Sequence, residues 1–144
     1  MTSAISAHER VAQSLARQGM MNHLGVRLLS ATEGQVELAL PFSDKVTQQQ
    51  GGFHGGAMGA LADIAGGYAA LTVAPEGMEV TTVEYKINFL ASFQGGEIRA
   101  IGRVTKAGKR IIVTTAELVH VDDSGKRSDC ALMQQTLVPV TKTY

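Results

Sequence analysis

The sequence is poor in cysteine and tryptophan and has no excess of charge of either sign. It contains one cysteine, Cys130, and no tryptophan in 144 residues, so no disulfide framework can form within the chain. Its 13 basic and 13 acidic residues cancel, which argues against a broad basic surface for nucleic acid or an anionic membrane. Cys130 lies in an alternating, strand-like stretch and is interpreted as a small core hydrophobe. Together these features favour a reducing, cytoplasmic location.

Several common catalytic and cofactor motifs are missing as well. The four histidines, His8, His23, His54 and His120, show no metal-ligand spacing. There is no G-x-S-x-G elbow, no P-loop ending in G-K-[ST], and no G-x-G-x-x-G after a strand. We therefore expect no metal and no cofactor, and we do not expect a hydrolase with a Ser or Cys nucleophile.

We do not expect a secretory signal, because the N-terminal 18 residues lack a basic patch followed by an apolar block. One apolar run, residues 55–74, is about long enough to span a bilayer. It is interrupted by glycines, holds Asp63 near its centre and has no flanking basic cluster. We expect a buried helix there, and no membrane partner.

What the sequence contains is a helical N-terminus, that long apolar segment and several strand-like segments. Residues 6–18 predict an amphipathic helix that starts with a capping box of Ser6 and Glu9. The apolar run predicts a long helix ended by Pro75. Alternation of apolar and polar residues predicts strands over 26–33, 36–42, 83–89, 96–106, 110–121 and 127–140.

This order of elements predicts an α+β fold in which an antiparallel sheet wraps around one long central helix. The four closing strands are expected to form a meander. Residues 1–144 are expected to form a single domain, with residues 1–24 as an N-terminal helical extension.

Asp63 is the one formally charged residue between Gly55 and Ala74, and a carboxylate in so apolar a run is costly to bury without compensation. An apolar setting disfavours its charged form and makes it a candidate general base or nucleophile. A simpler account also fits: the side chain is exposed, or it caps a neighbouring loop.

The start of the same helix offers hydrogen-bond donors. The first N–H groups of a helix have no intrahelical partner and carry partial positive charge. Gly55 has no side chain to keep another oxygen away, so its N–H could serve as an oxyanion hole. Asp63 lies about 12 Å further along the axis, so one carbonyl cannot meet both groups of one helix. If both act in one reaction, they must come from two chains, which predicts a homodimer.

The run G51-x-x-H54-G55-G56-x-x-x-x-L61-A62-D63-x-A65 resembles the signature of hotdog-fold acyl-CoA thioesterases of the phenylacetate-catabolism type. The resemblance implies hydrolysis of an acyl-CoA thioester to a free acid and CoA. It implies that Asp63 activates water or attacks the thioester, and that Gly55 of the other subunit donates its N–H to the thioester oxygen. It also implies that dimers commonly pair into homotetramers.

Three further residues are candidates for the site, two because they match family positions and one because it directly precedes Gly55. Gln48 stands where the family usually has asparagine, and keeps the carboxamide that orients substrate or water. Thr82 matches the Ser or Thr that often orients the water, although a plain strand threonine would look the same. His54 is interpreted as a residue that orients the loop by hydrogen bonding.

The segment 103-RVTKAGKR-110 gathers basic residues on one predicted hairpin. Lys106, Lys109 and Arg110 are candidates for binding the phosphates of CoA by charge-assisted hydrogen bonds, with Lys109 and Arg110 preferred. The alternative is a solvated hairpin tip whose lysines protect a sheet edge.

Two rival functions remain on the same scaffold. One is a non-catalytic module that binds acyl-CoA or another acyl ligand, since fold alone does not settle function. The other is a hydratase, which fits poorly because His54 and Asp63 lie about 13 Å apart along the helix. The acyl group is left open between aromatic and short or medium fatty acyl.

Overall fold

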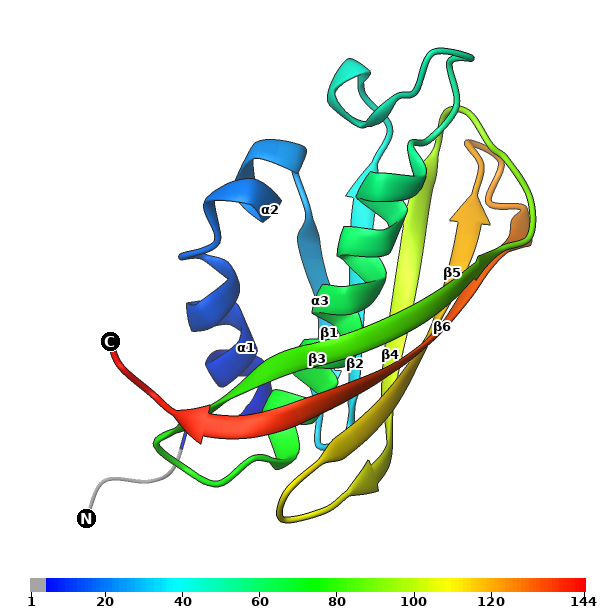
Figure 1. Cartoon of the computed structure of the whole chain (residues 1–144). Helices are drawn as coiled ribbons and strands as arrows, with labels where there is room; N and C mark the ends of the chain where they lie inside the picture. Colours follow the sequence, from blue (N-terminus) through cyan, green and yellow to red (C-terminus); the bar gives the residue numbers. More distant parts are fainter. Residues whose placement is uncertain (1–4) are drawn as a thin grey trace.

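The computed structural model describes residues 5–144 and consists of one curved antiparallel sheet around a central helix (Figure 1). The helices are α1 (Ala7–Leu15), α2 (Gly19–Leu24) and α3 (Gly55–Val73), with a short 3-10 turn at Asp44–Val46. The strands are β1 (Arg27–Thr32), β2 (Gln35–Pro41), β3 (Met78–Phe89), β4 (Glu97–Ala107), β5 (Ile112–Val121) and β6 (Arg127–Thr141). The predicted fold class is confirmed.

The strand order is β1-β2-β4-β5-β6-β3, and every neighbouring pair is antiparallel. The predicted meander of four closing strands is therefore wrong in one respect. β4, β5 and β6 form a meander, but β3 pairs with β6 at the far edge of the sheet and is not paired with β4. Alternation of apolar and polar residues identifies a strand, but it does not indicate which other strands pair with it. Here the pairing of β3 with β6 follows from the way the sheet wraps around α3.

α3 is apolar around most of its circumference because the curved sheet and α1 both pack against it. Leu61, Ala62 and Ala65 are buried, and so is Leu71 near the C-terminal end. By length and composition this helix could cross a membrane, but here it forms the centre of the hydrophobic core. Its last turn ends where predicted, with Ala74 already extended before Pro75.

Glycines bring the sheet and the helix into backbone contact. A Cβ on Gly102 of β4 would overlap the Ala65 carbonyl of α3. A Cβ on Gly66 would overlap the Gln135 side chain and lie 2.6 Å from the Thr114 hydroxyl oxygen. These two positions are thus restricted to glycine by space, and the sheet's inward side chains reach the helix backbone.

The N-terminal helices pack across one side of α3 and β1 (Figure 1). Ser6 caps α1 by accepting from the Glu9 N–H at 3.1 Å, as predicted. The helix predicted over 6–18 ends at Leu15, and a second helix that was not predicted, α2, follows it and is ended by Gly25 at a φ of 80°. Arg10 ties α1 to the end of α3 by donating to the carbonyls of Ala74 and Met78, each at 3.0 Å.

Candidate active site

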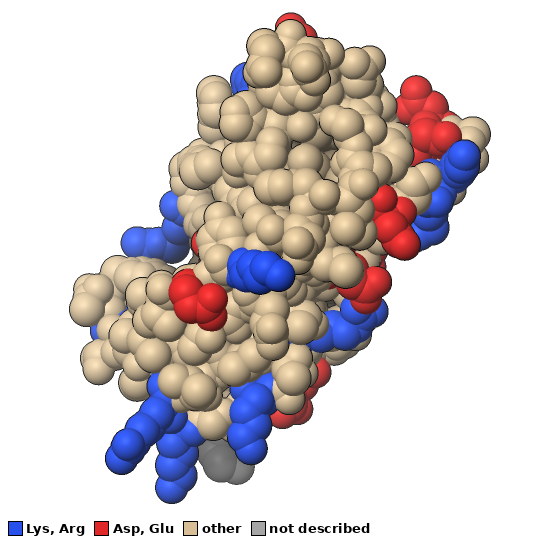
Figure 2. All heavy atoms as spheres, turned by 45° about the vertical axis from the view of Figure 1, so that its right-hand side comes forward, with Lys and Arg blue, Asp and Glu red and all other residues tan. Residues whose placement is uncertain are grey.

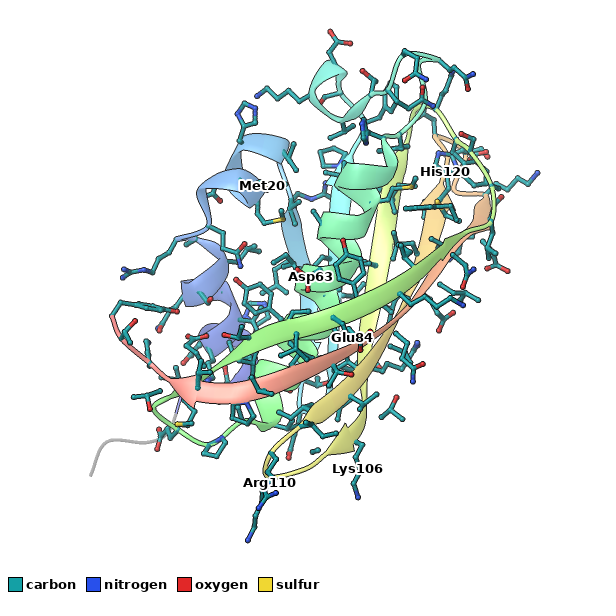
Figure 3. The ribbon with its side chains drawn as sticks, viewed as in Figure 1. Met20, Asp63, Glu84, Lys106, Arg110 and His120 are labelled. Atoms are coloured by element: carbon teal, nitrogen blue, oxygen red, sulfur yellow. The ribbon has the colours of Figure 1, made fainter. Side chains whose placement is uncertain are left out.

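Asp63 lies midway along α3 and faces a cavity of about 460 Å³ (Figure 3). Thr82 of β3 lines the same cavity, and its hydroxyl donates to Asp63 Oδ1 at 2.8 Å. The structure therefore brings this predicted pair together across α3 and β3. Both side chains are half-buried, so Asp63 is neither an exposed surface residue nor a cap on a loop.

A third residue, missed by the sequence analysis, completes the surroundings of Asp63. Gln135 of β6 donates its Nε2–H to the same Oδ1 at 2.7 Å and is fully buried. A signal for it exists in the sequence, because Gln135 falls in the inward register of β6 between Met133 and Leu137. A glutamine in an inward position needs hydrogen-bond partners.

The rest of the cavity is formed mainly by apolar side chains. These come from α3, β3 and β6: Ile64, Tyr68, Leu71, Val80 and Leu137. Ser14, Arg17 and Gln18 from the α1 region, with Glu79 and Tyr144, form a polar end. Burial raises the pKa of the Tyr68 phenol, an effect opposed by its hydrogen bonds to Ser14 and Gln18. The cavity can therefore accept an apolar group next to a carboxylate.

The start of α3 carries the predicted donor. The Nδ1 of His54 accepts from the Gly56 N–H at 2.7 Å, which makes His54 the N-cap of the helix. Within residues 5–144, no acceptor is bonded to the Gly55 N–H. The Phe89 ring lies so close that a Cβ on Gly55 would come within 3.3 Å of it. Gly55 thus has an N–H with no hydrogen-bond acceptor among the described residues, and its missing side chain leaves room for the Phe89 ring.

Gln48 lies in the loop that leads to this helix start. Its backbone N–H donates to the Gly52 carbonyl at 3.0 Å, and its side-chain carbonyl accepts from the Gln50 N–H. It borders a separate hollow of about 310 Å³ with Ser92 and Phe93. The candidate residues of one chain therefore form two separate groups: Gln48, His54 and Gly55 at the helix start, and Asp63 with Thr82 in the middle.

Of the three candidate CoA-binding residues, Lys106 lies at the end of β4, and Lys109 and Arg110 lie in the turn between β4 and β5. Figure 3 places Lys106 and Arg110 at the lower end of the molecule, pointing away from Asp63. Lys106, Lys109 and Arg110 are all exposed, and none forms an ion pair with another residue of the described chain. Figure 2 shows basic side chains gathered at this lower end, below a mainly uncharged upper surface.

Other chemistries have no comparable site among residues 5–144. No group of three or more His, Cys, Asp or Glu side chains is placed to hold a metal. Cys130 is buried, as predicted, and its thiol donates to the Met58 sulfur at 3.3 Å. Burial raises the pKa of the Cys130 thiol to about 11, so little thiolate forms near neutral pH.

A curved antiparallel sheet wrapped around one long helix defines the hotdog class of proteins. The chain belongs to the thioesterase superfamily, whose model matches residues 50–125. The resemblance predicted from the 51–65 motif is confirmed, and membership supports hydrolysis of acyl thioesters in general.

Two curated proteins and two solved structures illustrate this relationship. A protein of Saccharolobus solfataricus called a putative esterase is 34% identical over 69% of this chain and 70% of its own length. The 1,4-dihydroxy-2-naphthoyl-CoA hydrolase of Listeria monocytogenes is 32% identical over 82% of this chain and 85% of its own.

Among solved structures, a thioesterase family protein from Silicibacter pomeroyi has a TM-score of 0.90 and 35% identity, covering 94% of this chain and 99% of that one. The PaaI protein of the E. coli phenylacetic acid degradation operon has a TM-score of 0.83 and 23% identity, with 95% of each chain covered. The latter is a likeness of fold.

Proposed function

We propose that the protein hydrolyses an acyl-CoA thioester to a carboxylic acid and free CoA. The observation that carries the proposal is the Asp63 carboxylate: its Oδ1 is held by Thr82 and Gln135 at 2.8 and 2.7 Å, while the side chain borders a largely apolar cavity. A pocket that only bound an apolar chain would gain nothing from this carboxylate. The name of the Listeria relative, an acyl-CoA hydrolase, supports CoA as the thiol.

We further propose that the working unit is a dimer joined along β3. This strand is an edge of the sheet, is 12 residues long, and exposes Val83, Tyr85 and Phe89. A long apolar edge is prone to pair with another chain. Antiparallel pairing of two such strands runs the two central helices in opposite directions, which brings the Gly55 end of one helix toward the Asp63 region of the other.

In this dimer each thioester lies between the two groups of residues, one from each subunit. Asp63 Oδ2 removes a proton from a water molecule, and the resulting hydroxide attacks the thioester carbon. The carbonyl oxygen becomes negative and is stabilised by the N–H of the partner subunit's Gly55. The C–S bond then breaks and the electron pair leaves on sulfur. Because thiolate is a good leaving group, no strong general acid is required.

Direct attack by Asp63 is the alternative chemical step, and it is distinguishable by isotope. In ¹⁸O-labelled water, a base mechanism places ¹⁸O only in the carboxylic acid. Attack by Asp63 forms an anhydride with the acyl group, so water that opens it at the aspartyl carbon transfers ¹⁸O to Asp63. ¹⁸O found by mass spectrometry in the peptide that contains Asp63 after single turnovers would identify direct attack by Asp63.

The acyl group is proposed to occupy the cavity beside Asp63. A volume of about 460 Å³ lies within the usual range of small-molecule sites and suits an aromatic or a medium-length acyl group. Thiol release from a panel of aromatic, short and medium acyl-CoAs, followed with a thiol-reactive dye, would identify the preferred class. Saturable binding without thiol release would instead support the non-catalytic binding module.

The first variant to test is Asp63→Asn, which keeps the size of the side chain and removes its basicity. We expect kcat to fall by about 10²–10⁴-fold, with circular dichroism and urea unfolding close to those of the parent. Asp123→Asn, at an exposed residue of the β5–β6 turn, is the matched control. Turnover by Asp63→Asn at the parent rate would rule out the proposed mechanism.

A further inference from the structure

Gln135 and Thr114 form a buried polar pair directly behind Asp63. Both side chains have an exposed fraction of 0%, and neither lines the cavity. The Thr114 hydroxyl of β5 lies 2.7 Å from Gln135 Oε1, and Gln135 Nε2 lies 2.7 Å from Asp63 Oδ1 and 3.3 Å from the Thr82 hydroxyl oxygen. The chain of contacts runs from β5 through β6 to the carboxylate on α3.

The direction of these hydrogen bonds is fixed by chemistry. An ionised carboxylate only accepts, so the Gln135 amide must turn its NH₂ toward Asp63 and its oxygen toward Thr114. A threonine hydroxyl can donate to that oxygen. If Thr114 lost its hydroxyl, the amide oxygen would be buried without this partner, and the orientation that presents NH₂ to Asp63 would be less favoured.

This buried hydrogen-bonded pair makes the free energy of folding less favourable than an apolar pair would. A buried glutamine needs all of this hydrogen bonding to offset its desolvation, where an apolar side chain at position 135 would continue the core between Met133 and Leu137. It also requires glycine at position 66, because a Cβ there would overlap Gln135 Oε1. Glycine inside a helix costs about 1 kcal/mol against alanine. The buried glutamine and the helix glycine both reduce stability, and both are needed for the contact with Asp63. Such locally unfavourable choices are typical of a functional site.

We propose that Thr114 and Gln135 are positioning residues that fix the Asp63 carboxylate through Oδ1 and so aim Oδ2 at the reacting water. Neither residue touches the substrate. This inference rests on the proposed function, since it assigns a role to Asp63 as the reacting carboxylate. Oδ1 accepts from Thr82 and Gln135, and no residue in the described part of the chain donates to Oδ2.

The test uses three single variants of the protein and the double variant that combines Thr114→Val with Gln135→Met. Thr114→Val removes the hydroxyl but keeps the shape, Thr114→Ser keeps the hydroxyl, and Gln135→Met keeps the approximate length of the side chain without its amide. Thr115→Val is the matched control, because Thr115 is adjacent on β5 and no hydrogen bond from its side chain is seen in residues 5–144. Each variant is measured for kcat, KM and urea unfolding with the best substrate of the panel.

We expect Thr114→Val and Gln135→Met to lower kcat by about 10- to 100-fold with little change in KM, because a displaced carboxylate affects the chemical step. Thr114→Ser should recover most of the loss. Since Thr114 acts only through Gln135, adding Thr114→Val to Gln135→Met should cause no further fall in kcat. If Thr114 and Gln135 were only structural, the variants would change the free energy of unfolding. They would not lower kcat at constant KM, and the double variant would not match Gln135→Met alone.

The inference is overturned if Thr114→Val has the kcat of Thr114→Ser, or if the losses of the two single variants multiply in the double variant. Should Gln135→Met fail to fold, the comparison of Thr114→Val with Thr114→Ser still decides. Failure of the proposed function looks different, because Asp63→Asn would then remain active. An inactive Asp63→Asn with fully active Thr114→Val overturns only the positioning role.

Discussion

The Asp63 carboxylate occupies an apolar helix because side chains from two strands reach it there. Thr82 arrives from β3 and Gln135 from β6, and both donate to the same oxygen, Oδ1. The opposite end of the Gln135 amide is held by Thr114. Space for this contact exists because position 66, one turn further along α3, has no side chain. Small residues in this helix thus serve the site as well as the packing.

Gly66 gives a direct test of that statement. In Gly66→Ala the new methyl group would overlap Gln135 Oε1 and crowd the Thr114 hydroxyl, so we expect a loss of about 1–3 kcal/mol in the free energy of unfolding, together with lower kcat. Gly67→Ala is the matched control. Its methyl group would meet nothing closer than 3.9 Å, and helix propensity should stabilise it by up to about 1 kcal/mol. Urea unfolding that ranked the two variants equally would contradict this packing.

The sequence identified site residues that are marked by their own neighbours in the chain. It missed Gln135, whose role depends on a contact between distant segments. Asp63 stands out as a single charge in an apolar run, and Thr82 was predicted from the family resemblance as the Ser or Thr on the strand that follows the helix. Gln135 lies 72 positions from Asp63 in the chain, inside a strand that alternates normally. Its partnership with Asp63 depends on β6 pairing with β3 and on the register of that pairing, which alternation does not encode.

Among the elements, the sequence predicted strands and helices better than their connections. β1 and β2 begin and end within one residue of the predicted ranges 26–33 and 36–42. β3 begins at Met78, earlier than the predicted 83, because its first half contains polar residues and a register shift between Thr82 and Glu84. That irregularity breaks the alternation next to the residue that contacts Asp63.

The β4–β5 hairpin carries the proposed CoA contacts, which remain a prediction. If Lys109 and Arg110 bind the phosphates of CoA, then Lys109→Ala with Arg110→Ala should raise KM for acyl-CoA several-fold and leave kcat nearly unchanged, because exposed charge pairs contribute modestly. Thioesters of N-acetylcysteamine, which lack the nucleotide, are the matched substrate control. An equal change in KM for both substrates would contradict a phosphate contact.

At the scale of the whole molecule, the two edge strands of the sheet, β1 and β3, are not equivalent. The β1 edge is six residues long and contacts α1, whereas β3 is twice that length and presents exposed apolar side chains. A sheet with one covered edge and one open edge has a single natural place for a second copy. The helix arithmetic requires a second copy if Gly55 and Asp63 serve one thioester.

Charge placed on that open edge should separate the subunits. We expect Val83→Lys with Tyr85→Lys to shift the protein to a monomer in size-exclusion chromatography with light scattering, and to lose activity although its circular dichroism persists, because like charges would face each other across the two-fold axis. Leu29→Lys on the β1 edge is the control. A fully active monomer would contradict the composite site.

The most direct measurement of the central claim combines two inactive chains. Asp63→Asn removes the carboxylate, and Gly55→Pro removes the N–H at the first helical position, where proline is tolerated and where His54 already has the extended ψ of 133° that precedes proline well. Co-expression with two affinity tags allows mixed dimers to be purified away from the two parents.

If each site takes Asp63 from one protomer and the Gly55 N–H from its partner, a mixed dimer contains one site with both lesions and one site with neither. We predict that mixed dimers recover about half of the wild-type kcat per dimer, while both parent dimers are inactive. Mixed dimers as inactive as their parents would contradict the account, because they would show that the two groups do not meet across the subunit interface.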